Sequence, residues 1–205
     1  MKKEQELLKN TIILTIGKIC TQFVSFLLLP LYTALLIPAE FGVVDLFNTY
    51  IALLVPLFNW QFENGMFRFL LDCRNDKNEI KKIFSTVFFV NIIQSVIYLI
   101  FYICTKNFIS SSYKNFLAVD VVLSIFLNTL LQFPRGLGNN ATYAFGSFIS
   151  ATATILMNVV FIAWFRMGAY GMFFATIFAK IITIIYLIFK SNIPEYLKIK
   201  FYDKE

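Results

Sequence analysis

Long apolar runs alternate with short polar segments along the whole chain. A transmembrane helix needs about 20 mainly apolar residues. Six stretches meet this requirement: about 11–37, 41–70, 83–104, 116–134, 142–165 and 170–190. The pattern therefore predicts an all-α membrane protein in which residues 1–205 form a single six-helix lobe. Pro30 and Pro56 predict kinks inside the first two helices, and Pro38 predicts a tight hairpin between them.

Basic residues gather on one side of the predicted membrane. Of the 18 Lys and Arg residues, 13 lie at the N-terminus, around the loop after the second stretch, after the fourth stretch or after the sixth. Lys106, Lys114 and Arg166 lie on the opposite side. Because cytoplasmic loops are enriched in Lys and Arg, we expect both termini to face the cytoplasm. The basic residues form no continuous face, so no nucleic-acid partner is expected.

The composition supports the membrane class and argues against an enzyme. Hydrophobic residues make up 59% of the chain and charged residues 15%, whereas soluble domains have about 45–50% and about 25%. The absence of histidine excludes Ser-His triads and His-ligated metals. The three cysteines have unrelated spacings and form neither a disulfide framework nor a metal motif. We expect no enzymatic activity, no metal and no cofactor.

Polar residues recur at helical spacing inside several of the apolar stretches. One such stripe runs from Thr11 to Ser25 and includes Lys18 and Gln22, and another runs from Asp120 through Asn128 to Arg135. The remaining stripes include Asn59 and Glu63 in the second stretch, Asn158 in the fifth and Lys180 in the sixth. Spacings of three and four place the members of a stripe on one helical face. Such a face either hydrogen-bonds to a neighbouring helix or lines a polar cavity.

Charged residues inside the stretches are harder to explain by packing, because a Lys or Asp at the centre of a helix costs about 2.5–3.5 kcal/mol. Lys180 lies near the middle of its stretch and either has a functional role or forms an ion pair with Asp120 or Glu63. Lys18 lies nearer an end and either has such a role or extends to the membrane interface. Arg68 is an alternative partner for Glu63. Asp120, like Asp45, is expected at a solvated helix end.

Several short segments carry a recognisable pattern. They are Leu29-Pro30-Leu31-Tyr32-Thr33, Ile37-Pro38-Ala39-Glu40-Phe41-Gly42, Pro56-Leu57, Glu63 with Arg68-Phe69, Arg135-Gly136-Leu137-Gly138, and Gly168-Ala169-Tyr170-Gly171. Together they resemble the N-terminal half of Wzx-type lipid-linked oligosaccharide flippases, which belong to the multidrug/oligosaccharidyl-lipid/polysaccharide transporter superfamily. The resemblance covers nearly the whole chain.

The resemblance implies both a substrate and a mechanism. Such flippases move undecaprenyl-pyrophosphate-linked sugar units across the bacterial inner membrane for surface polysaccharides of the O-antigen or capsule type. They alternate access between two six-helix lobes around a cationic cavity. The expected partners are therefore the lipid-linked oligosaccharide, membrane lipid, and either a second six-helix lobe or a second copy of this chain.

The resemblance and the stripes together suggest a substrate site. Lys and Arg are natural counter-ions for a pyrophosphate in a low-dielectric cavity. The resemblance implies Lys18 and Arg68 as substrate-binding residues, and the depth of Lys180 in its stretch adds Lys180. The predicted supporting polar side chains are Gln22, Asn59, Glu63, Asp120, Asn128, Arg135 and Asn158.

Three other functions remain open. A drug or cation antiporter of the same superfamily would bind its cation at Asp45, Glu63 and Asp120, although the most deeply placed charges are basic. A membrane enzyme acting on lipid intermediates would be expected to have histidine, paired loop carboxylates or a sizeable soluble loop. A membrane assembly subunit without transport activity is the third alternative.

Overall fold

The computed structural model describes residues 28–108 and 111–197, together with Thr15, Ile19, Phe23 and Phe26. This part of the chain is helical and contains no β-strand. Its elements are a helical segment at residues 28–35, α2 (Pro38–Asn59), α3 (Phe62–Asp72), α4 (Lys77–Thr105), α5 (Lys114–Gly136), α6 (Asn140–Asn158), the π-helix η1 (Val159–Trp164), α7 (Gly168–Lys190) and α8 (Ile193–Tyr196). The predicted all-α class is confirmed.

Five helical segments are long and apolar enough to cross a membrane: α2, α4, α5, α6 together with η1, and α7. The last three begin and end within two residues of the predicted stretches. Helix α4 begins six residues earlier than predicted, because the Asp76 side chain accepts hydrogen bonds from the backbone N–H groups of Asn78 and Glu79 and caps the helix. About half of the first predicted stretch lies outside the described residues, so a sixth span and the orientation of the termini stay predictions.

The second predicted stretch, 41–70, is not one helix kinked at Pro56. The structure divides it into α2 and α3, because Trp60 and Gln61 adopt left-handed φ angles of 47° and 55°. Pro56 lies inside α2, and the backbone N–H of Trp60 donates to the Pro56 carbonyl as α2 ends. Left-handed backbone is strained for residues other than glycine. The interruption is therefore a specific structural feature rather than a gentle bend.

The predicted hairpin at Pro38 is present, but Pro38 begins a helix instead of ending one. The preceding helical segment ends at residue 35, Leu36 and Ile37 make the connection, and Pro38 occupies the first turn of α2. Proline fits there because its missing N–H would have no partner inside the helix. We call this end of the bundle, with the α4–α5 and α6–α7 connections, the hairpin end. The opposite end, with loops 73–76, 137–139 and 191–192, is called the basic end.

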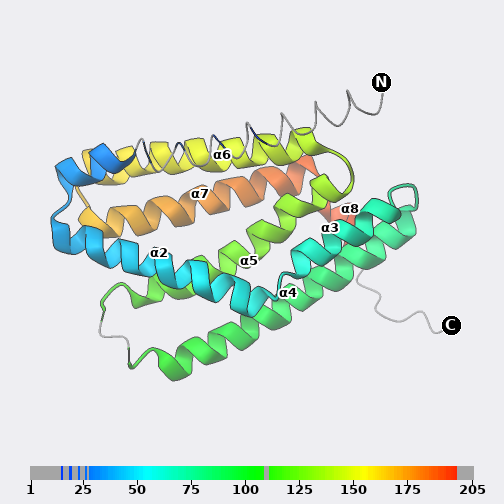
Figure 1. The fold of residues 1–205 in the computed structure, drawn as a ribbon, viewed down its shortest axis with the longest axis horizontal. Coiled ribbons are helices and arrows are strands. Elements are labelled where there is room, and N and C mark those ends of the chain that lie inside the picture. The colour runs from blue at the N-terminus through cyan, green and yellow to red at the C-terminus, as the bar shows by residue number, and fades with distance from the viewer. Residues whose placement is uncertain are drawn as a thin grey trace.

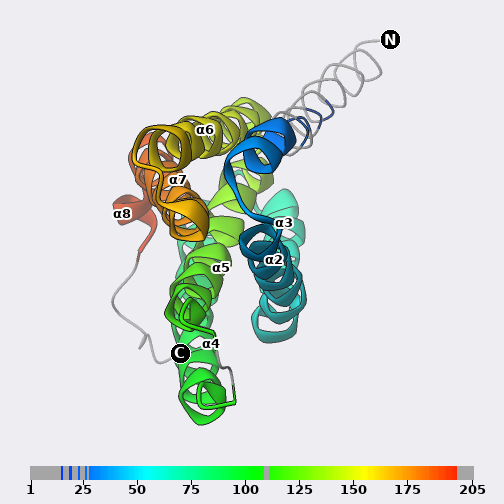
Figure 2. The same ribbon diagram turned by 90° about the vertical axis from the view of Figure 1, so that its left-hand side faces the viewer.

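Helix α5 is the centre of the bundle. It contacts α2, α3, α4, α6 and α7. In the view along the bundle it lies between the α6–α7 pair and α4, with α2 and α3 to one side (Figures 1 and 2). The most extensive helix pair is α6 with α7, and α2 has the smallest buried share among the five candidate spans.

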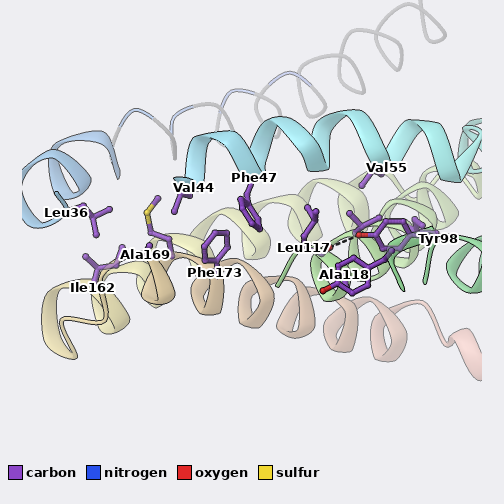
Figure 3. Packing of buried hydrophobic residues seen from close by; sticks show 14 residues of the cluster. Leu36, Val44, Phe47, Val55, Tyr98, Leu117, Ala118, Ile162, Ala169 and Phe173 are labelled. Atoms are coloured by element: carbon purple, nitrogen blue, oxygen red, sulfur yellow. Dashed lines mark hydrogen bonds between the residues drawn. The ribbon is translucent and has the colours of Figure 1, made fainter. Parts of the chain in front are cut away.

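Buried apolar side chains form one cluster at each end of α5. In the hairpin-end cluster, the rings of Phe47 and Phe173 meet edge to face with their centroids 5.2 Å apart. The Tyr98 hydroxyl in the same cluster donates to the Leu117 carbonyl at 3.1 Å (Figure 3). The basic-end cluster contains Leu70, Phe84, Phe133 and Leu187. The two clusters hold the polar faces of α5 and α7 in fixed positions between them.

Candidate functional site

Lys180 and Asp120 form an ion pair between α7 and α5. The Lys180 ammonium donates to Asp120 Oδ2 and also to Ser124 Oγ, the latter at 2.8 Å. Asp120 and Ser124 are four residues apart, so one helical face presents both to the lysine. Of the two partners considered for Lys180, the structure selects Asp120. A role of Lys180 in substrate binding stays a prediction.

Asp120 does not lie at a solvated helix end, so that expectation is wrong. The residue is only 4% exposed, and its Oδ1 atom is buried without a hydrogen-bond partner. The cause is the central position of α5, whose hairpin-end turns are covered by α2, α4 and α7. Because Oδ1 has no hydrogen-bond partner, the ion pair with Lys180 is the main interaction that stabilises the buried negative charge of Asp120.

A cavity of about 340 Å³ lies at the hairpin end. We call it the hairpin-end cavity. It is enclosed by residues 28–32, α2, α6 and α7, and its polar lining consists of Tyr32, Asp45, Asn48, Thr154 and Thr176. Thr176 precedes Lys180 by one helical turn on the same face of α7. The ion pair therefore continues the polar lining toward the centre of the bundle.

Asn158, predicted as a supporting residue, anchors the wall of this cavity. It is fully buried, and its Oδ1 accepts from the Tyr32 hydroxyl at 3.0 Å while its Nδ2 donates to the Thr154 carbonyl at 2.7 Å. Through these bonds, α6 fixes the position of the helical segment before the hairpin. Tyr32 belongs to one of the motif segments but was not predicted as a site residue.

The predicted basic residues of the basic end lie apart from Lys180. Arg68 is exposed on α3. The guanidinium carbon of Arg135 lies 4.6 Å from the centre of the Phe67 ring and 5.4 Å from that of Tyr143, and its Nη1 donates to Gln132 Oε1 at 3.2 Å. Arg135 therefore joins α3, α5 and α6. Lys18 and Gln22 lie outside the described residues, and Asn128 is half-buried on α5.

A second buried polar group surrounds the α2–α3 break. Asn59 Nδ2 donates to Glu63 Oε2 at 2.5 Å. Gln94 Nε2 of α4 donates to the backbone carbonyl of Asn59 at 2.9 Å. Asn91 Nδ2, one turn earlier on α4, donates to Thr129 Oγ1 of α5 at 2.7 Å. The prediction named Asn59 and Glu63 but missed the α4 members. Their spacing of three residues was the signal that would have revealed them.

These features agree with a comparison against protein families. A family model described as polysaccharide biosynthesis protein matches residues 7–199. The chain belongs to this family. No curated protein and no solved structure is significantly similar to it. With its long apolar helices, this polysaccharide biosynthesis protein is a multi-pass membrane protein.

In this polysaccharide biosynthesis protein, two of the motif segments meet at the hairpin end. Gly168 begins α7 with a left-handed φ of 57°, and a Cβ atom added there would lie 2.3 Å from Glu40 Oε1. Glu40 belongs to the hairpin motif, where its Oε2 accepts from the Ile37 backbone N–H. The close approach explains why the segment that begins α7 has glycine at position 168.

A third motif segment packs at the basic end. The Gly136 carbonyl accepts from Arg74 Nε at 2.8 Å, and a Cβ atom at Gly136 would lie 2.8 Å from a Leu70 side-chain carbon. Arg74 therefore stabilises the fold in addition to being one of the basic residues that predict the membrane orientation. It ties the loop after α3 to the end of α5.

Alanine at Gly168 should destabilise the protein by about 2 kcal/mol, because a side chain disfavours the left-handed backbone and contacts Glu40. The matched control is Gly42→Ala, where an added Cβ meets nothing within 4 Å inside α2. That change should be neutral or slightly stabilising. Thermal unfolding of the purified variants in one detergent measures both. Equal midpoints for the two variants would contradict the assignment.

Proposed function

We propose that this protein is a transport lobe that moves an undecaprenyl-pyrophosphate-linked oligosaccharide from the inner to the outer leaflet of the bacterial inner membrane, for surface polysaccharides of the O-antigen or capsule type. The family and the membrane-spanning helices support a role in polysaccharide transport. The observation that carries the proposal is the placement of Lys180 one turn below the hairpin-end cavity. A cation at that depth suits a diphosphate in a low-dielectric site.

In the described conformation, Asp120 neutralises this cation. A diphosphate that enters the cavity competes with Asp120 for Lys180 and Ser124. Loss of the lysine leaves a buried carboxylate unpaired, at a cost of about 3–5 kcal/mol. A diphosphate competes for the lysine because it carries a higher charge and more acceptor oxygens than Asp120 does. The Lys180–Asp120 pair thus holds the lysine in place until a substrate arrives.

Arg68 has a different place in this scheme. It is exposed on α3 at the basic end, which the distribution of Lys and Arg predicts to be cytoplasmic. We assign it to the first contact with the head group at the inner leaflet. Lys18 remains a proposed cavity residue from its position in the sequence.

The lobe is proposed to act with a second body of similar size. Asp45 and Asn48 are exposed on α2, inside a candidate membrane span. Polar groups of this kind are costly in contact with lipid. A second six-helix lobe, or a second copy of this chain, would cover them and complete an alternating-access pair. The polar lining of the hairpin-end cavity then faces a water-filled path.

Deleting the gene tests the proposal. We expect surface polysaccharide to disappear while the lipid-linked oligosaccharide accumulates on the cytoplasmic leaflet, because synthesis continues without translocation. Extraction of the lipid-linked pool and immunoblotting of surface polysaccharide measure both quantities, and the wild-type gene supplied in trans is the control. Normal surface polysaccharide after deletion would contradict the proposed function. A change in drug or cation resistance alone would favour an antiporter.

A further inference from the structure

The buried polar group at the α2–α3 break has more acceptors than donors. Asn59 is 1% exposed and Gln94 is 2% exposed. Each amide nitrogen makes one hydrogen bond, from Asn59 Nδ2 to Glu63 Oε2 and from Gln94 Nε2 to the Asn59 backbone carbonyl. The side-chain oxygens Asn59 Oδ1 and Gln94 Oε1 are buried without a hydrogen-bond partner. Nearly all buried polar atoms in proteins have a partner, so each exception calls for an explanation.

Turning the amides over does not remove the surplus. A backbone carbonyl and an ionised carboxylate can only accept hydrogen bonds. Rotating Gln94 by half a turn would place its oxygen against the Asn59 carbonyl, and rotating Asn59 would place its oxygen against the Glu63 carboxylate. Both arrangements bring acceptors together. The oxygens are therefore the atoms that need an outside partner.

Among the residues that the structure describes, Glu63 has no ion-pair partner for its negative charge. It is buried, and Asn59 is its side-chain partner. Arg68, the neighbouring cation expected to neutralise it, is exposed on α3 and forms no ion pair with it. Lys180 is already bound to Asp120. A buried carboxylate without a compensating positive group is costly, so a cation from solution would stabilise this position.

The backbone at the break joins the carbonyl end of α2 to the N-terminal end of α3, whose first turn contains Glu63. Helix α2 ends at Asn59, and the left-handed residues Trp60 and Gln61 separate it from α3. The carbonyl end of a helix carries partial negative charge. Interrupted membrane helices bind coupling cations through such ends and unwound carbonyls. Asn91, one turn from Gln94 on α4, has a further buried oxygen without a partner.

We propose that the α2–α3 break binds a monovalent alkali cation through Asn59 Oδ1, Gln94 Oε1 and the Glu63 carboxylate. Amide and carboxylate oxygens are hard ligands, which suit alkali and alkaline-earth ions. A single carboxylate balances one positive charge and leaves a divalent ion half compensated. The bound ion ties α2 and α3 to α4, and so fixes the break in the described geometry. The site does not depend on which molecule the lobe transports.

Thermal unfolding of the purified full chain in nanodiscs tests the site. The protein is measured in NaCl, in KCl and in N-methyl-D-glucamine chloride at constant ionic strength. A bound ion should raise Tm with the logarithm of its concentration, by roughly 3–6 °C for each tenfold increase above its Kd. The large organic cation should give no such rise. Equal Tm values in all three salts would overturn the proposal and leave ordered water or a protonated Glu63 at the break.

Two variants and one control assign the effect to these residues. Glu63→Gln removes the charge at nearly constant shape, and Gln94→Met removes the oxygen at nearly constant length. Each should abolish the dependence of Tm on Na⁺ or K⁺. Asp72→Asn makes the same chemical change as Glu63→Gln at an exposed carboxylate of α3, and should keep the full response. A wild-type response from both site variants would overturn the assignment.

If Glu63→Gln does not fold, Gln94→Met and direct binding of radioactive Na⁺ to the wild-type chain decide the question. Absence of saturable Na⁺ binding, together with equal Tm values in KCl and the organic salt, would overturn the proposal. All of these measurements are made without lipid-linked oligosaccharide. Failure of the proposed transport function would therefore leave them unchanged, and the reverse also holds.

Discussion

Replacing Lys180 with methionine should destabilise the protein by about 3–5 kcal/mol. The change leaves Asp120 buried with neither oxygen in an ion pair, since Oδ1 already lacks a partner. The reverse change, Asp120→Asn, should cost less, because the Lys180 side chain is 20% exposed and its ammonium reaches solvent more readily than the carboxylate does. The thermal unfolding midpoints of the purified variants measure this asymmetry.

The double variant Lys180→Met/Asp120→Asn should recover most of the lost stability. Replacing both partners of a buried pair is often neutral or even stabilising, whereas removing one partner is not. Lys190→Met is the matched control, since Lys190 is exposed in the last turn of α7, and it should change stability by less than about 0.5 kcal/mol. A Lys180→Met variant as stable as Lys190→Met would show that the pair contributes nothing to the fold.

The same double variant should be present at normal levels in the membrane and yet export surface polysaccharide about 10- to 100-fold more slowly. Its fold is retained, but the diphosphate has lost a charged hydrogen-bond donor, which is worth about 1.5–3 kcal/mol. Export is measured as the rate at which surface polysaccharide reappears after induction of the variant in the deletion strain. Lys190→Met should export normally.

Normal export by the stable double variant would remove Lys180 from the substrate site and leave it a structural residue. The stability and export measurements separate these two roles, which the single Lys180 substitution does not. Loss of the protein and loss of transport give the same cellular result for that single change.

Most of the helix positions could be predicted from hydrophobicity, but the α2–α3 break could not. The boundaries of α5 and α7 follow from where the apolar runs end, since the membrane imposes that length. At the break, neither Trp60 nor Gln61 is a residue that favours left-handed backbone. Pro56, the visible helix-breaking residue, lies inside a continuing helix. The Gln94 side chain, 35 residues away in sequence, donates to the Asn59 backbone carbonyl at the break, and such a contact is not visible in the local sequence.

Site residues could be predicted where their position within an apolar stretch was enough to indicate burial. They could not be predicted where the packing of neighbouring helices determines burial. The position of Lys180 near the middle of an apolar stretch was enough to predict a partner or a function. The burial of Asp120 was not, because its place near the start of a stretch suggested solvent and only the arrangement of helices around α5 covers it. Asn91 and Gln94 were missed because their stretch is strongly apolar and contains no charged residue to draw attention to its polar face.

The two residues of the central ion pair, Asp120 and Lys180, are synthesised at different times. Lys180 is made 60 residues after Asp120, a delay of about 3–12 s at a synthesis rate of about 5–20 residues per second. During that interval the nascent chain contains the carboxylate but not yet the ammonium that neutralises it. We therefore expect α5 to reach its final depth only after α7 emerges from the ribosome and inserts. Helix α7 therefore supplies the charge that allows the central helix to settle.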